Sequence, residues 1–260
     1  MKELFFIFSL FIVLRGFCQS DNLVGPQNLA LGSSSGEKNL WTAWRNPALT
    51  TSSANQLLLG TFVQKLYALS DWHQTGLAFQ IQSKNWQWGS YLFYNGSPHW
   101  NQKHGYIFLS RKLTKDFQCG LGLQMNQEFA SNRNKQHYSY SGTVGFNIQL
   151  DKYWRLAFSI KNIQEQSSKM QGNIGLCFEP NKQITWILGA FQTQIHPISF
   201  HSGLRYKLPK IFTFRCGIRS IPSAYSYGVE IDLSYLSIQF GFENHQSIGL
   251  NPIVGIQKSL

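Results

Sequence analysis

Most of the chain alternates between apolar and polar residues with a period of two. In residues 143–150 the even positions are apolar and the odd positions are polar or glycine, and residues 211–219, 224–233 and 235–243 repeat this division. Successive side chains of a strand point to opposite faces, so the pattern predicts strands with one apolar and one polar face. Almost no segment has the 3.6-residue period of a helix. The sequence therefore predicts an all-β chain.

About fourteen such segments follow one another, and turn-forming residues separate them. Their lengths, roughly nine to thirteen residues, fit tilted strands that cross a bilayer, and an even count places both ends of a barrel on one side. We predict a membrane-spanning antiparallel up-and-down β-barrel of about 14 strands over residues 56–260. The segments are 56–67, 74–82, 85–94, 104–112, 116–127, 138–150, 152–163, 171–180, 183–193, 199–208, 211–220, 224–233, 235–243 and 247–258.

The connections between these segments alternate in length. Beginning with the second, every other one is a tight turn, and five of these six turns contain a lysine, namely Lys84, Lys115, Lys152, Lys182 and Lys210. Most intervening connections are expected to be longer polar loops, such as 94–103, 129–137 and 163–170. Outer-membrane barrels have short periplasmic turns and longer outer loops. A soluble β-sandwich also alternates but does not sort its turns in this way.

The first twenty residues have the pattern of a secretory signal peptide. Lys2 precedes an apolar run from Leu4 to Leu14, and small or polar residues follow near Ser20. Such a run is too short to span a membrane, so we expect residues 1–20 to be removed on export. Cys18 raises the alternative of a lipoprotein, but Phe17 stands where a small residue is required. Residues 21–55 then form an N-terminal leader.

The composition of the exported chain limits the classes of partner that it is expected to bind. Without residues 1–20 the chain has 21 Lys and Arg against 11 Asp and Glu, a net charge near +10. An exported chain with no basic helix or long basic run has little use for nucleic acid, so outer-membrane lipid or protein is the expected partner. The chain has no second apolar run of about eighteen residues, so the sequence predicts no transmembrane helix. The three remaining cysteines, Cys119, Cys177 and Cys216, have no disulfide or metal spacing.

Charged residues on the polar face gather in the last third of the chain. We expect them to form a lumen charge cluster, in which pairing of 211–219 with 224–233 places Arg215 opposite Glu230 and Thr213 opposite Asp232. The cluster either stabilises the barrel through cross-strand pairs or binds a charged group. The basic members are His201, Arg205, Lys207, Arg215 and Arg219, and the acidic members are Glu230, Asp232 and Glu243.

Glycine recurs on the polar face of most predicted strands, for example at Gly120, Gly145, Gly203, Gly217 and Gly228. A strand glycine often marks the close approach of another backbone, which would leave room for a segment inside the lumen. Alternatively, the glycines let a small barrel curve. Both interpretations stay open at this point.

No catalytic or cofactor-binding constellation is evident. The seven histidines have no metal-ligand spacing, and His201 and Ser202 are adjacent in a predicted strand, so they point to opposite faces and cannot act as a nucleophile and base. We predict a protein that is not an enzyme and needs no cofactor or metal.

The leader resembles the start of mature outer-membrane proteins of the FadL/PorV type. The matching positions are Gly25, Leu31, Gly32 and the motif Asn46, Pro47 and Ala48, which directly precedes the first predicted strand. The resemblance implies a fourteen-stranded barrel in the outer membrane and a leader that folds back into it as a plug. A periplasmic tail is the alternative.

The same resemblance suggests two functions. The predicted polar lumen argues against a fatty-acid cargo, so we expect a PorV/PorQ-like scaffold or shuttle that is linked to type IX protein secretion and has secretion or surface proteins as partners. The alternative is a FadL-like passive transporter of small hydrophobic or amphipathic solutes, and a structural barrel without cargo also stays open. The chain departs from the family in its modest loops and in ending at Leu260 without a terminal aromatic residue.

Overall fold

The structure is a computed structural model that describes residues 25–32, 36–50, 57–66, 69, 71–131, 135–163, 170–193, 197–209, 211–246 and 249–260. The expected signal peptide, residues 1–20, lies outside the described residues, as does Cys18. Of the expected leader, residues 25–32 and 36–50 are described.

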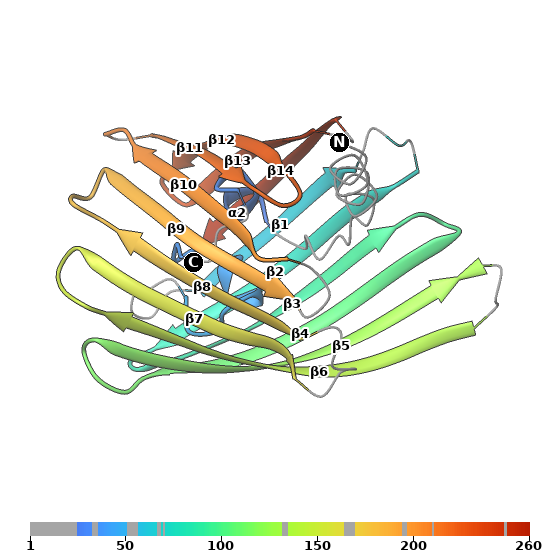
Figure 1. The fold of residues 1–260 in the computed structure, drawn as a ribbon, viewed down its shortest axis with the longest axis horizontal. Helices are drawn as coiled ribbons and strands as arrows, with labels where there is room; N and C mark the ends of the chain where they lie inside the picture. The colour runs from blue at the N-terminus through green and yellow to red at the C-terminus, as the bar shows by residue number, and fades with distance from the viewer. Residues whose placement is uncertain are drawn as a thin grey trace, which may run out of the picture.

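Fourteen antiparallel strands close into a barrel (Figure 1), which confirms the predicted fold class. Each strand pairs with its neighbours in the chain, and the first strand pairs with the last. The strands are β1 (Leu57–Lys65), β2 (His73–Ser83), β3 (Trp86–Gly96), β4 (Trp100–Lys112), β5 (Phe117–Ala130), β6 (Lys135–Gln149), β7 (Trp154–Ile163), β8 (Gln171–Phe178), β9 (Ile184–Thr193), β10 (Ser199–Lys207), β11 (Phe212–Arg219), β12 (Ala224–Leu233), β13 (Leu236–His245) and β14 (Gly249–Ser259).

The sheet closes where β1 meets β14. Leu58 pairs with Ser259 and Gln64 pairs with Ile253. Leu57 N–H donates to the Leu260 carbonyl at 3.1 Å, and Leu260 N–H donates to the Leu57 carbonyl at 2.9 Å. Closure matters because water in a bilayer core is too scarce to satisfy an open strand edge.

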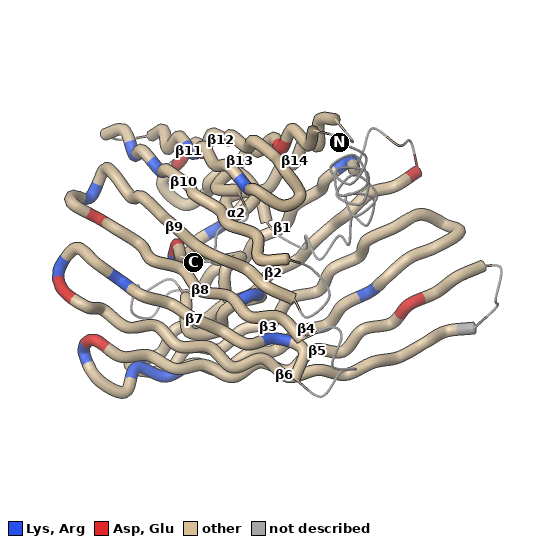
Figure 2. The backbone as a smooth tube through the Cα atoms, in the orientation of Figure 1, with Lys and Arg blue, Asp and Glu red and all other residues tan. Residues whose placement is uncertain are grey.

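Burial along the strands is the reverse of burial in a soluble protein. The polar face is buried inside the barrel, whereas the apolar face is exposed, with Leu121 at 62% and Leu123 at 65% exposure. Charged residues gather at the turns of one end of the barrel, while long stretches of the strands have none (Figure 2). An outward apolar surface of this kind is stable only against lipid.

The predicted register between β11 and β12 is wrong by two residues. Arg215 lies opposite Gly228, and Thr213 lies opposite Glu230. The hairpin begins with Arg219 opposite Ala224, so residues 220–223 form a four-residue connection, and loop length fixes the register of the whole pair. The two-residue shift keeps every side chain on its expected face, since the side-chain period is two.

Two of the predicted long loops are mostly strand. Residues 97–99 alone connect β3 to β4, and residues 131–134 connect β5 to β6. Polar residues are common in loops, and for this reason the sequence predicts loops here. In the structure residues 94–96, 100–103, 129–130 and 135–137 extend the hairpins as paired strand, where backbone hydrogen bonds hold polar residues as well as apolar ones.

Candidate functional site

The described part of the N-terminal segment, residues 25–32 and 36–50, lies inside the barrel (Figure 1). All of these residues are buried except Lys38 and Arg45, which are partly exposed. The helix α2 (Pro26–Ala30) packs against β11 to β14, and a 3-10 turn, η2 (Thr42–Trp44), follows. Pro26 suits the first helical position, but a five-residue helix is not stable alone. Packing against the barrel wall therefore holds it.

Lumen glycines leave the space that this segment fills. A Cβ atom on Gly217 would lie 2.3 Å from the backbone N of Gly32, and one on Gly145 would lie 2.1 Å from Asn46 Oδ1. Such distances are too short for any side chain. The same holds for Gly120, Gly203, Gly228 and Gly255, which face Pro47, Leu31, Ala30 and Pro26 respectively. At these positions glycine permits close approach of the segment.

The Asn-Pro-Ala motif attaches the end of the segment to the wall. Asn46 Nδ2 lies 3.2 Å from the carbonyl oxygens of Phe146 in β6 and Phe158 in β7, to which it donates. Asn46 Oδ1 accepts a hydrogen bond from Ala48 N–H at 3.0 Å, which fixes the turn locally. Pro47 lies over Gly120. The motif therefore bonds to the strands through its asparagine.

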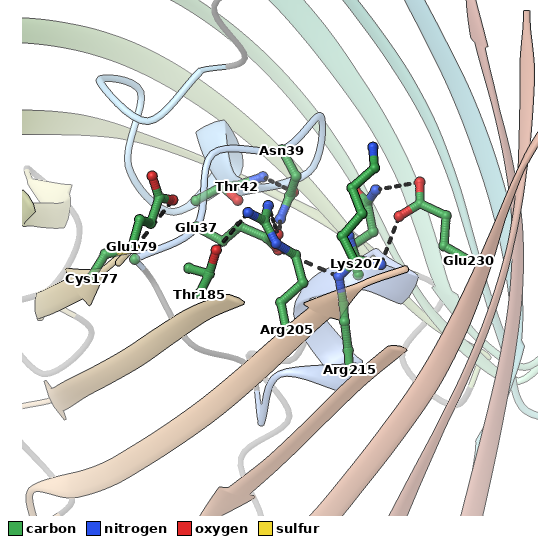
Figure 3. A network of polar contacts seen from close by, with 12 residues as sticks. Glu37, Asn39, Thr42, Cys177, Glu179, Thr185, Arg205, Lys207, Arg215 and Glu230 are labelled. Atoms are coloured by element: carbon green, nitrogen blue, oxygen red, sulfur yellow. Dashed lines mark hydrogen bonds and ion pairs between the residues drawn. The ribbon is translucent and has the colours of Figure 1, made fainter. Parts of the chain in front are cut away.

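Glu37 is the centre of a charged network between the segment and the wall (Figure 3). Its carboxylate is 1% exposed and lies 2.8 Å from Arg205 Nη1 in β10 and 3.6 Å from Arg215 Nε in β11. Arg215 Nη1 also lies 2.7 Å from Glu230 Oε2, and Gln27 Nε2 of the segment donates to Glu230 Oε1 at 3.0 Å. Three strands and two parts of the segment thus share one network of ion pairs and hydrogen bonds.

The pKa of Glu37 reflects these contacts. Burial alone raises the pKa of this carboxyl, but the charges of Arg215 and Arg205, with hydrogen bonds from Asn39 and Arg205, outweigh burial and hold the pKa below its usual value. Glu37 is therefore ionised at neutral pH. A buried charge of this kind is stable only while its partners remain in place.

The structure divides the predicted lumen charge cluster. Arg205, Arg215 and Glu230 join the network of Glu37. Arg219 pairs separately with Glu243, and both side chains are buried. Asp232 meets Lys207 at 3.5 Å near the mouth of the barrel, where both are more exposed.

Two charged residues that attach the segment to the wall, Glu37 and Arg155, were not among the predicted site residues. Glu37 is the sole acidic residue in 25–50, and the expected cluster had one more Lys or Arg than Asp or Glu, so a charge count would have pointed to it. Arg155 in β7 donates to the Gly36 carbonyl at 3.0 Å and also contacts Glu179 at 3.3 Å. Arg155 binds a backbone oxygen, and a side-chain pattern gives no signal for such a contact.

The opposite wall of the lumen is aromatic, which corrects the prediction of a polar and charged lumen. Trp41 and Trp44 of the segment pack against it, with Trp44 4.7 Å from Phe93 and 5.1 Å from Tyr106 between ring centroids. The sequence did not reveal this wall because β3 and β4 are apolar on both faces there. The buried aromatic residues of the wall are Phe62, Tyr91, Phe93, Tyr106 and Phe108.

A polar cavity of about 180 Å³ lies beside Glu37. Arg205, Lys207, Asp232 and Lys38 are among its lining residues. Burial lowers the pKa of Lys38 to about 8, and repulsion from Arg155 and Lys112 adds to the effect. The cavity therefore presents charges of both signs and has room for a few waters or a small polar group.

Within the part of the chain that the structure describes, no cluster of three or more His, Cys, Asp or Glu residues could hold a metal ion. Cys119, Cys177 and Cys216 are not disulfide-bonded. Across the same described residues, no helix combines the length and the apolar character needed to span a membrane.

The fold is similar to that of solved hydrocarbon channels. The toluene transporter TbuX of Ralstonia pickettii matches 95% of this chain and 99% of its own, with a TM-score of 0.72 and 11% identity. The chain has the fold of FadL-type outer-membrane barrels. The monoaromatic hydrocarbon channel CymD matches 91% of this chain and 97% of its own, with a TM-score of 0.71 and 10% identity. The toluene transporter TodX of Pseudomonas putida matches 90% of this chain and 96% of its own, with a TM-score of 0.66 and 12% identity.

No protein-family model matches the sequence, and no curated protein matches it significantly. At 10–12% identity, the likeness to these structures shows the fold of the chain. They give no support to the narrower PorV/PorQ likeness.

We expect Gly217→Val to destabilise the protein by about 1–3 kcal/mol, because the new side chain overlaps the backbone at Gly32. Gly172→Val is the matched control, since a Cβ at Gly172 meets no atom within 4 Å. The measurement is the unfolding temperature in detergent, read from heat-dependent mobility on gels. Equal unfolding temperatures for the two variants would contradict the packing of the segment against β11.

We expect Glu37→Gln to cost about 3 kcal/mol, because it leaves Arg205 without its carboxylate. The segment should then leave the wall more often and expose Lys38 and Arg45 to trypsin, while the barrel stays folded. Asp232→Asn is the control, because an exposed pair contributes at most about 1 kcal/mol. Trypsin cleavage at the same rate in both variants would show that Glu37 does not hold the segment.

The contribution of Glu37 should depend on pH. Its pKa in the folded protein lies below the ordinary value of 4.5, so its stabilisation is fully present above about pH 4.5 and is lost as the pH falls through the lower folded value. The difference in unfolding temperature between the wild type and Glu37→Gln should be constant from pH 7 to 5 and shrink below pH 4.5. A difference that stays constant down to pH 3 would refute this.

Proposed function

We propose that this protein is a non-enzymatic passive channel of the outer membrane for small hydrophobic or amphipathic solutes, and that the N-terminal segment closes it at rest. The observation that carries the proposal is the aromatic wall inside the barrel, formed by β1 to β4 and packed by Trp41 and Trp44. Aromatic side chains in a channel interior offer apolar solutes a path that a purely polar lumen does not.

The fold supports the same function. The barrels of similar architecture include toluene transporters and a monoaromatic hydrocarbon channel. In this chain the charged wall of β10 to β12 lies across from the aromatic wall, so an amphipathic solute would find partners on both sides. A solute can pass only if the segment moves, since residues 25–32 and 36–50 fill space between the two walls. The ion pairs of Glu37 would then set how often the channel opens.

The test is uptake of radiolabelled toluene by Gram-negative cells that produce the protein, because lipopolysaccharide slows hydrocarbons at the cell surface. Uptake should be faster with Glu37→Gln and with a chain lacking residues 21–54 than with the wild type. In the shortened chain, Phe93→Asn should slow toluene uptake and leave arabinose uptake unchanged. If no variant takes up toluene faster than cells without the protein, the proposal fails.

The secretion-linked scaffold that the PorV/PorQ resemblance implies stays a prediction, and none of the contacts among the described residues favours it. A mild-detergent pull-down of the mature protein from outer membranes distinguishes the two functions. Stoichiometric recovery of secretion components would support the scaffold. Recovery of the barrel alone would leave the channel proposal in place.

A further inference from the structure

The outer wall of the barrel has a depression at Gly105 in β4. Its neighbour Tyr106 points into the lumen and is buried, so position 105 faces outward. A Cβ on Gly105 would meet a single atom within 4 Å, Leu92 Cδ2 at 3.9 Å. The missing side chain therefore leaves a gap in the outward apolar surface, with the strand backbone as its floor.

This gap is part of a groove of about 440 Å³ across β2 to β5. Its sides are the outward apolar residues Leu77, Leu92 and Met125, which are 57%, 60% and 43% exposed. A surface groove with such sides fits a flexible hydrocarbon chain, because filling it removes apolar surface from both partners.

Cationic and aromatic residues border the groove toward the end of the barrel opposite the short turns. Lys103 lies opposite Tyr94 in the register of β3 and β4, and both line the groove. His73 stacks on Tyr94 at 5.1 Å, and Lys65 lies opposite His73 on β1. Lys65, His73 and Lys103 thus form a basic row above the apolar groove.

The spacing of the two lysines favours a particular kind of headgroup. Lys65 in β1 and Lys103 in β4 are three strands apart and are offset by two residues along the strands, since Lys65 is level with His73 and Lys103 with Tyr94 and Thr75. At the usual strand spacing and rise their Cα atoms are about 16 Å apart, and the two long side chains can span headgroup phosphates that are closer together than that. A phospholipid carries one phosphate, whereas lipid A carries a phosphate at each end of a disaccharide. In an outer-membrane barrel the end opposite the short turns faces the outer leaflet, where lipid A is found.

We propose that this surface is a binding site for lipid A, with one acyl chain in the groove at Gly105 and the two phosphates bound by Lys65 and Lys103. Tyr94 and His73 lie between the two lysines and border the disaccharide. The site faces lipid and is separated from the lumen by the strands themselves. The inference is therefore independent of the channel function proposed above.

The experiment is native mass spectrometry of the full mature protein in mild detergent, titrated with purified lipid A and, separately, with phosphatidylglycerol. The wild type should bind one lipid A, and at least about tenfold more tightly than phosphatidylglycerol, since two charge-assisted contacts are replaced by one. Lys65→Gln with Lys103→Gln should remove this preference. Gly105→Leu should weaken lipid A binding by filling the groove.

Lys115→Gln with Lys152→Gln is the matched control, because these lysines lie at the short-turn end. Heat-dependent gel mobility shows whether each variant is folded, and the lysine pair carries the test if Gly105→Leu does not fold. Equal affinity for the two lipids would overturn the assignment to lipid A. Unchanged binding in the Lys65 and Lys103 variant, or equal losses in the control, would overturn the site.

Discussion

The need to satisfy every backbone hydrogen bond without water determines this structure. In lipid, a strand edge has no solvent partner, so the sheet must close, and here it closes by pairing β1 with β14. Fourteen strands enclose more space than their own side chains can fill. The barrel therefore creates an interior that something else must occupy, and the N-terminal segment occupies it.

The way in which the segment is held follows from the chemistry of that interior. A lumen sheltered from water makes an unpaired charge costly, so the excess arginine charge of the wall requires a carboxylate. Glu37 provides it, and the Arg155 contact with the Gly36 carbonyl adds a second attachment next to it. The glycines of β5, β6 and β10 to β12 allow close approach of the segment at residues 30–32 and 46–48, which precede and follow Glu37 in the chain. Close packing thus holds the segment on both sides of the residues that make the charged contacts.

The two walls of the lumen differ in the kind of attachment they offer. On the charged wall, binding of the segment depends on ionisation and on the alignment of Glu37, Arg205 and Arg215. On the aromatic wall it depends on apolar contact, with Trp41 and Trp44 packed against Phe62, Phe93 and Tyr106. Loss of the ionic attachment would leave the aromatic one, so the segment can loosen on one side first.

The sequence pattern alone predicts the number of strands, a closed barrel and the inner face of most strands, because period-two alternation is a local property that each strand carries alone. It also predicts Arg215 and Glu230 on the inner face, and the structure confirms this, although their predicted register was wrong by two residues. The face of a residue depends only on whether its position in the strand is odd or even, whereas the register between two strands depends on the exact length of the turn. Tertiary structure alone decided that Glu37 lies between Arg205 and Arg215 and that β1 to β4 form an aromatic wall. Contacts between residues 37 and 215 depend on how the chain folds back into the barrel. Where both faces of a strand are apolar, as at Tyr91 to Phe93, the pattern cannot say which face is inside.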